Sequence, residues 1–122
     1  MSTFKTVATT ALMSLLLHAR AFAVSNEAPI TVGSSDARGS FHAASSSGDH
    51  TQYLTCGLSA SSDPSAPISL SCSASDSNGK YYVCSAQNPS EAWIKMVAHL
   101  NKNSWIAFAG DAEGRCHSLT VQ

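Results

Sequence analysis

The sequence predicts a small α+β domain: an antiparallel sheet of four to six strands, one helix packed across a face of that sheet, and two disulfides. Strand-like runs, separated by clusters of Pro, Gly, Asn and Ser, flank a single segment of helical periodicity. The pattern A-x-D-x-x-G-[KR] occurs at 74–80 and again at 109–115, which predicts two similar hairpin turns. Four cysteines, an even number, indicate a disulfide framework in an exported chain.

Residues 1–23 have the three parts of a cleavable signal peptide. One positive charge, Lys5, precedes an uncharged apolar stretch, and Ala21 and Ala23 form the small-x-small end that signal peptidase requires. A membrane-spanning helix needs about 20 apolar residues, more than this stretch offers before Arg20 closes it. We therefore expect cleavage near Ala23, a secreted or periplasmic chain, and no membrane association after cleavage.

The mature chain is expected to be mildly acidic. The full chain has 7 basic and 8 acidic residues, and cleavage removes Lys5 and Arg20, which leaves a net charge near −3. The remaining basic residues are scattered, whereas nucleic-acid binders and cationic membrane-active peptides cluster theirs. Nucleic acid is therefore not an expected partner, and the remaining length suits one domain.

Composition divides the mature chain into a flexible arm over residues 24–36 and a disulfide-stapled domain over residues 37–122. The arm has no hydrophobic periodicity. At the start of the domain, residues 38–45 form the first candidate strand, which ends in a turn rich in Ser and Gly.

Three further strands are predicted at 52–60, 68–75 and 80–85. The middle one alternates apolar residues with serines, which is typical of a half-buried strand with a hydroxyl-rich outer surface. A helix is predicted over 88–101, with Asn88 as its N-cap and Pro89 at its first position. The last hairpin pairs two strands on either side of the second turn. We expect the following side chains to anchor the core: Trp93 on the helix, with Trp105 or Ile106 and Phe108 on the sheet.

In the two repeated turns, Asp76 and Asp111 are expected to accept hydrogen bonds from amides of their own turns. The alternative for the first turn is a calcium site, because Asp76 and Asn78 match the start of an EF-hand loop. The next ligand position of that loop lacks an acid or amide, and its twelfth position is Gln87 where a Glu is required. We therefore expect no metal site.

The cysteines are Cys56, Cys72, Cys84 and Cys116, and their gaps are wider than the close pairs typical of zinc sites. The turn positions place Cys56, Cys72 and Cys84 on three neighbouring strands, where a bridge between the outer two would span about 9–10 Å, too far for a disulfide. Two pairings remain: Cys56–Cys72 with Cys84–Cys116, which we favour, and Cys72–Cys84 with Cys56–Cys116.

Known catalytic motifs are missing from the sequence: it has no G-x-S-x-G and no H-x-x-x-H, and its histidines share no pattern. We expect no enzyme activity and no cofactor, but a non-catalytic binding or interaction protein with a protein or carbohydrate partner. The alternatives are a structural cell-surface component and a small secreted hydrolase. Tyr81, Tyr82 and Trp105 are the candidate binding residues, because aromatic rings stack on sugars and partner surfaces; otherwise they fill the core.

The signal peptide, the spaced cysteines and the D-x-x-G turns together resemble small exported bacterial proteins of unknown function. The resemblance covers residues 37–121 and depends on the cysteines and on Asp76, Gly79, Asp111 and Gly114. It implies no activity.

Overall fold

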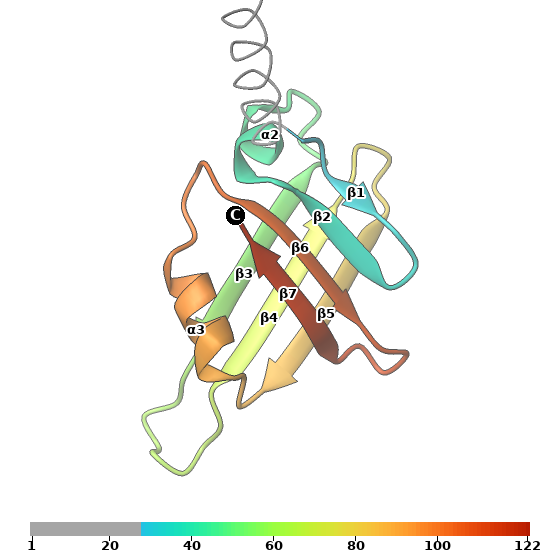
Figure 1. The fold of residues 1–122 in the computed structure, drawn as a ribbon. Coiled ribbons are helices and arrows are strands. Elements are labelled where there is room, and N and C mark those ends of the chain that lie inside the picture. The colour runs from blue at the N-terminus through green and yellow to red at the C-terminus, as the bar shows by residue number, and fades with distance from the viewer. Residues whose placement is uncertain (1–27) are drawn as a thin grey trace, which may run out of the picture.

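Two antiparallel sheets pack face to face in the computed structural model, which describes residues 28–122 (Figure 1). Sheet A has the order β1-β2-β6-β7, with β1 (Thr31–Val32), β2 (Asp36–Ser40), β6 (Trp105–Gly110) and β7 (Cys116–Val121). Sheet B has the order β3-β4-β5, with β3 (Tyr53–Ser59), β4 (Ser69–Ser75) and β5 (Tyr81–Gln87). Helix α2 (Phe41–Ser46) connects β2 to β3, and α3 (Glu91–Ala98) connects β5 to β6. The predicted signal peptide lies outside the described residues.

The antiparallel pairing, the main helix and the two disulfides are confirmed, but the expected single sheet is wrong. The strands divide between two sheets, and the domain is dominated by β-structure. Each sheet has one apolar face, and a single short helix is too small to cover either of them. Both faces are therefore buried against each other, with α3 packed beside them against β3 and β7.

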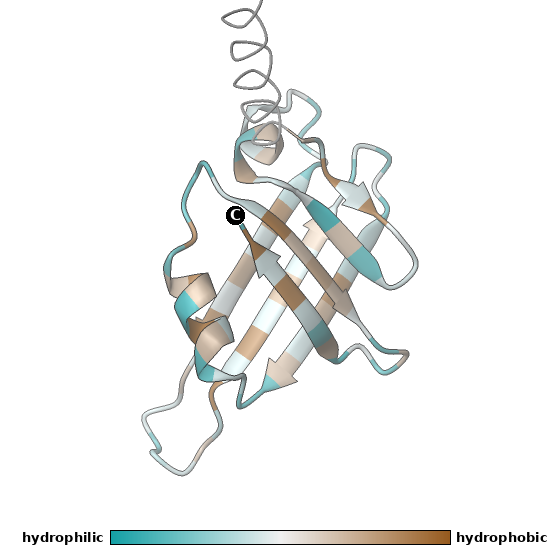
Figure 2. Cartoon of the chain, in the orientation of Figure 1, coloured by the Kyte–Doolittle hydropathy of each residue, from teal (hydrophilic) through white to brown (hydrophobic). Residues whose placement is uncertain are grey.

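The buried cluster lies between the two sheets. Figure 2 shows hydrophobic bands that alternate along the strands, as expected where one side of each strand faces a core. Ile106 and Phe108 belong to this cluster, as predicted, whereas Trp105 is half-buried on the opposite side of β6 and Trp93 packs against the cluster from α3. The largest fully buried side chains are Phe108, Leu70, Ile106, Cys72 and Cys84.

The described part of the predicted flexible arm is ordered into sheet A. Ile30 and Val32 are buried, and the backbone N–H of Ser40 donates to the carbonyl of Ala28. Strand β1 pairs antiparallel with β2 and forms an edge of the sheet. Two paired residues are too few for periodicity to reveal in the sequence, so tertiary packing overrides the composition of this segment.

The strand predicted over 38–45 is replaced by a strand and a helix. Strand β2 ends at Ser40, whose Oγ accepts the backbone N–H of Ala43 at 3.0 Å and so caps α2. A serine at this place supplies the acceptor that the first free amides of a helix need, and it stops the strand there.

The second helix also begins later than predicted. Ser90 is the N-cap of α3, and its Oγ accepts the N–H of Trp93. Asn88, the predicted cap, has a φ of 51° and donates its backbone N–H to the Ile68 carbonyl at 2.8 Å. Asn tolerates this left-handed conformation better than most residues, so it serves the loop between β5 and the helix instead.

The first repeated turn, at Asp76, forms the hairpin between β4 and β5 as predicted. The Asp76 Oδ1 accepts the backbone amides of Asn78 and Lys80, at 2.9 and 3.0 Å. Gly79 has a φ of +81°, a conformation that glycine adopts without the penalty other residues meet.

The second repeated turn, at Asp111, has the same hydrogen bonds between β6 and β7. The Asp111 Oδ1 accepts the backbone amides of Glu113 and Arg115, at 3.0 and 2.9 Å. Gly114 has a φ of +78°. The prediction of two equivalent hairpin turns is therefore confirmed.

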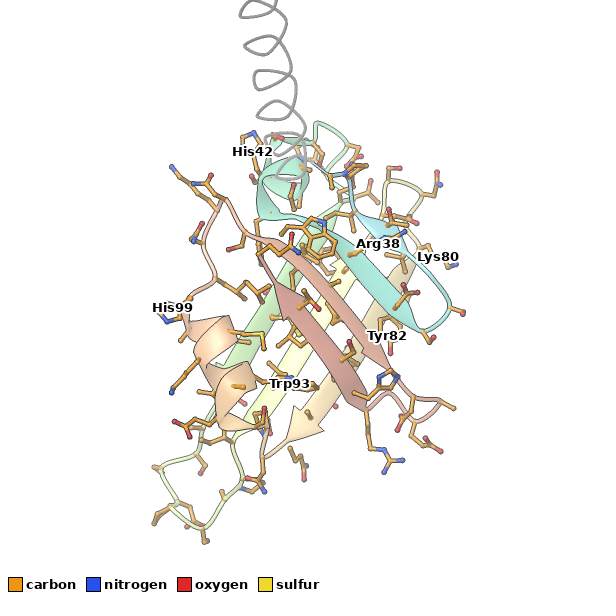
Figure 3. The ribbon with its side chains drawn as sticks, viewed as in Figure 1. Arg38, His42, Lys80, Tyr82, Trp93 and His99 are labelled. Carbon is orange, nitrogen blue, oxygen red and sulfur yellow. A yellow bond between two sulfur atoms is a disulfide. The ribbon has the colours of Figure 1, made fainter. Side chains whose placement is uncertain are left out.

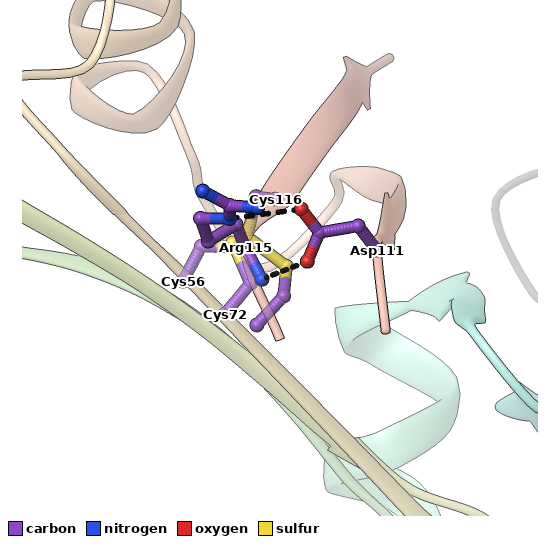
Figure 4. Close-up of a disulfide and its surroundings, with 6 residues drawn as sticks. Cys56, Cys72, Asp111, Arg115 and Cys116 are labelled. Carbon is purple, nitrogen blue, oxygen red and sulfur yellow. Dashed lines mark hydrogen bonds and ion pairs between the residues drawn. A yellow bond between two sulfur atoms is a disulfide. The ribbon is translucent and has the colours of Figure 1, made fainter. Parts of the chain in front are cut away.

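The disulfides join Cys56 to Cys72 and Cys84 to Cys116, the sequential pairing favoured above. Cys72 is the register partner of both Cys56 and Cys84, so the three cysteines of sheet B lie in one row across its inner face. The first disulfide therefore lies within sheet B, and the second ties β5 to β7 of sheet A (Figure 4). Two disulfides indicate an oxidising compartment outside the cytoplasm.

Candidate functional site

The outward face of sheet B is a regular three-stranded surface, and we call it the serine face. Leu54, Cys56, Leu70, Cys72 and Cys84 point inward from its three strands, so the alternate residues point outward. The serine face consists of twelve residues in register: Tyr53, Thr55, Gly57, Ser59, Ser69, Ser71, Ser73, Ser75, Tyr81, Val83, Ser85 and Gln87.

The twelve residues of the serine face include six serines and no charged side chain. Most of the twelve are exposed, with Ser75 the buried exception. The outer surface of a sheet usually carries charged side chains, because lysine, glutamate, arginine and aspartate are the residues that most favour water. A solvent-facing sheet without any charge is therefore a distinctive feature of this chain.

One end of the serine face is aromatic. Tyr53 on β3 and Tyr81 on β5 are both register partners of Ser75 on β4, so the two tyrosines lie two strands apart, about 9.5 Å. Tyr53 is 43% exposed and Tyr81 is 70% exposed. Val83, which follows Tyr81 on the same side of β5, is 46% exposed. Three of the five exposed large hydrophobic side chains among residues 28–122 therefore gather at this end.

The other end of the serine face is polar. Ser71 is the register partner of Gly57 and of Ser85, and Gly57 has open space above it. Within residues 28–122, the hydroxyls of Ser71 and Ser85 make no hydrogen bond to protein, so each can donate to and accept from an incoming group. The serine face thus joins apolar rings to free hydroxyls on one flat surface.

A hollow of about 470 Å³ adjoins the serine face at strand β5, and it is lined by Ser85, Ala86, Gln87, Arg115 and Cys116. The Arg115 guanidinium lies 2.9 Å from an Asp111 carboxylate oxygen (Figure 4). It also lies 3.4 Å from a Glu113 carboxylate oxygen. Its charge is therefore balanced within its own turn, and the hollow offers no strong attraction to an anion.

The predicted aromatic residues are not brought together. Tyr81 lies on the serine face, but Tyr82 points inward, because adjacent residues of a strand face opposite sides. The Tyr82 ring, labelled in Figure 3, stacks on Phe108 with ring centroids 6.0 Å apart. Trp105 lies on the outward side of sheet A, so it is separated from Tyr81 by the full thickness of the domain.

Tyr53 is the residue that the sequence interpretation missed. Residues 53–59 alternate in the same way as the next strand, with Leu54 and Cys56 on one side and Tyr53 and Thr55 on the other. This alternation puts Tyr53 on the side opposite Leu54, but its place in the same row as Tyr81 depends on the β3–β4 register, which the loop between these strands does not reveal in the sequence.

The shifted titrations belong to turns and to the core. A hydrogen bond from the Gln52 side chain, with backbone amides of Thr51 and Gln52, lowers the pKa of Asp49 to about 2. Hydrogen bonds from the Arg115 amide and side chain lower the pKa of Asp111. Burial, with the nearby carboxylates of Asp111 and Asp36, raises the pKa of Tyr82. These shifts follow from turn geometry and packing, and none lies on the serine face.

The described histidines, cysteines and acidic residues do not gather at a metal site. Within residues 28–122, no three His, Cys, Asp or Glu side chains are grouped as a metal site would need, and all four cysteines are bridged. His42 lies on α2 and His99 follows α3, on separate elements (Figure 3). Over the same described residues, no helix is long and apolar enough to span a membrane.

No family model, curated protein or solved structure matches this chain.

Proposed function

We propose that the chain is an exported, non-catalytic binding protein that contacts its partner with the serine face. The observation that carries this proposal is the exposure of Tyr53, Tyr81 and Val83 on one sheet face without charge. Exposed apolar side chains that gather on one surface are typical of interaction sites. Tyr rings suit this role because they offer a large, rigid contact area at little cost in conformational entropy.

Further support comes from the way the face is built. Cys56–Cys72 lies directly behind it and Cys84–Cys116 ties it to the other sheet, so the surface is held rigid before any partner binds. A preformed surface avoids the entropic cost of ordering during association. The disulfides also match the export that the signal peptide predicts.

The test compares the mature, oxidised protein with two charge variants. Thr55→Lys with Ser71→Lys places two charges on the serine face, and Thr31→Lys with Thr120→Lys places two on exposed positions of sheet A as the matched control. The measurement is co-sedimentation with insoluble envelope and extracellular material of the producing cells. We expect the serine-face variant to lose at least tenfold in bound protein and the control to remain at the wild-type level. Equal binding by both variants, or binding by no form of the protein, would contradict the proposal.

A further inference from the structure

We infer that the serine face binds a neutral, extended polysaccharide whose sugar rings stack on Tyr53 and Tyr81. This inference rests on the proposed function and names the chemical class of the ligand. Four properties of the face support it: its charge, its size, the spacing of its rings and its hydroxyl groups.

The charge of the face indicates an uncharged ligand. None of its twelve described residues is ionisable at neutral pH, and the nearest charge along β5 is Lys80, at the turn before Tyr81. Polyanions bind surfaces where several basic side chains release counterions, and charged protein partners bind through complementary patches. A neutral ligand loses nothing by the absence of charge here.

The size of the face favours a narrow ligand over a folded protein. Three strands at about 4.8 Å spacing and seven residues at about 3.3 Å rise give a surface of about 14 Å by 23 Å, or roughly 330 Å². A standard protein interface involves about 20–30 residues on each partner, whereas the serine face has twelve, so this face alone is too small for a standard-size complex with a protein or with a second copy. A narrow, extended ligand, by contrast, can contact the face along its whole bound length.

The spacing of the two tyrosine positions matches a repeating ligand. The strand positions that carry Tyr53 and Tyr81 are about 9.5 Å apart, with the small side chain of Ser75 between them. In an extended β-1,4-linked chain, alternate sugars present the same face at a similar spacing. The apolar C–H face of a pyranose packs on an aromatic ring in the way that other amphipathic groups do. A chain laid across the strands therefore places one sugar on each ring.

The serine hydroxyls complete the site. The row of Thr55 and Ser73 follows the tyrosine row on the same side of the sheet, two residues or about 6.6 Å further along, which is within reach of a sugar chain stacked on the rings. The row of Ser71, about 13 Å away, lies beyond such a chain. Each hydroxyl donates and accepts, as each sugar hydroxyl does. Binding pockets commonly combine apolar contact with a few polar groups that fix orientation, and this face has the same combination in a flat form.

The experiment uses the mature, oxidised protein and defined glycans. Microcrystalline cellulose and chitin serve as insoluble probes, cellohexaose and chitohexaose as soluble ones, and polygalacturonate as a charged comparison. Tyr53→Ser with Tyr81→Ser removes both rings, and Tyr53→Phe with Tyr81→Phe is the matched variant that keeps them. We expect binding to at least one neutral glycan, a loss of tenfold or more in the serine variant, and less than threefold loss in the phenylalanine variant. Circular dichroism and intact mass verify that both variants are folded and oxidised.

Three outcomes would overturn the inference. In the first, no neutral glycan binds while co-sedimentation with envelope material still depends on the serine face and is abolished by protease treatment of that material; the partner is then a protein and the proposed function stands. In the second, the protein sediments as a dimer that Thr55→Lys with Ser71→Lys dissociates, so a second copy occupies the face. In the third, glycan binding persists in the serine variant, so the rings do not carry it.

Discussion

The β4–β5 and β6–β7 hairpins have the same turn but different surroundings. Asp76 and Asp111 each accept two amides of their own turn, and each turn closes with a glycine at positive φ. Among the described residues, Lys80 has no carboxylate partner, whereas Arg115, at the equivalent position, contacts two carboxylates. The repeated motif therefore fixes the shape of the turn and leaves its attachments open.

The second hairpin is attached to the other sheet at three further points. The Ser85 amide on β5 donates to the Gly114 carbonyl at 2.9 Å, and Cys84–Cys116 bridges the same two strands. Gly110 lies against Tyr82, so closely that any side chain there would meet the tyrosine hydroxyl. The first hairpin carries two of the three strands of the serine face, and the second hairpin holds β5 in place.

The largest expected difference concerns the disulfides. Cys84→Ala with Cys116→Ala removes the bridge between the sheets, and the loop-entropy account gives about 4 kcal/mol for its sequence separation of 32. Cys56→Ala with Cys72→Ala removes a bridge within one sheet, worth about 3 kcal/mol for a separation of 16. Urea unfolding followed by circular dichroism measures both. A larger loss of stability from Cys56→Ala with Cys72→Ala would show that the disulfide between the sheets is not the more stabilising of the two.

Gly110→Ala is expected to destabilise the protein by about 1–3 kcal/mol, the usual range for an overpacked core. Its new Cβ would meet the Tyr82 hydroxyl, and it would lie 2.8 Å from the Arg115 carbonyl oxygen and 3.1 Å from the Cys84 Cβ. Gly57→Ala, on the serine face, is the control because nothing lies within 4 Å of its Cβ position. Equal unfolding midpoints for the two variants would refute the close contact between the hairpins.

Tyr82→Phe is expected to stabilise the protein by up to about 1 kcal/mol, since an unpaired buried hydroxyl carries a desolvation cost. The Tyr82 hydroxyl is buried near the Gly110 backbone amide, but that amide already donates to the Ser35 carbonyl at 3.0 Å, which leaves the hydroxyl without a well-aligned partner within residues 28–122. Tyr81→Phe, one residue earlier and mostly exposed, is the control and should leave the unfolding midpoint unchanged. A destabilised Tyr82→Phe variant would show that the hydroxyl is bonded. In the double variant, Tyr82→Phe should also recover part of the stability that Gly110→Ala alone loses, because it removes the hydroxyl that the new Cβ would meet.

The smallest expected effect distinguishes the turns themselves. Asp111→Asn should lower the melting temperature by a few degrees, and Asp76→Asn by less, because only Asp111 also binds an arginine. The pKa of Asp111 is lowered in the folded state, so its stabilisation is present above the unfolded-state pKa and lost as the pH falls through the folded-state pKa. The difference between wild type and Asp111→Asn should therefore disappear in thermal melts at strongly acidic pH. A difference that persists there would assign the effect to packing.

Much of sheet B could be predicted from local sequence. The Asn78-Gly79 turn fixes the β4–β5 register, and with it the alignment of Cys72 and Cys84. The ends of the helices and strands were harder to predict, because serines are common in this chain and only some of them cap a helix. Ser40 and Ser90 each cap a helix through an Oγ that accepts an amide three residues later, while many other serines face solvent.

The candidate site was only partly accessible from the sequence. The hydroxyl-rich side of β4 follows from the alternation of its residues, and Tyr81 was among the predicted binding residues. Tyr53 could be joined to Tyr81 only through the pairing of both strands with Ser75. Trp105 was placed with them on chemical type alone, and the structure puts it on the opposite side of the domain.

The sequence by itself determined the features that depend on neighbours along the chain: the turns at Asp76 and Asp111, the alternation within strands and the helical periodicity of α3. Each of these is set by φ, ψ preferences and by side chains a few residues apart. Only the tertiary structure decided that the strands form two sheets, that Cys84 crosses between them and that Tyr53 and Tyr81 share an exposed face. These features require two apolar faces to be buried against each other, and that free energy depends on the whole chain and not on any single segment.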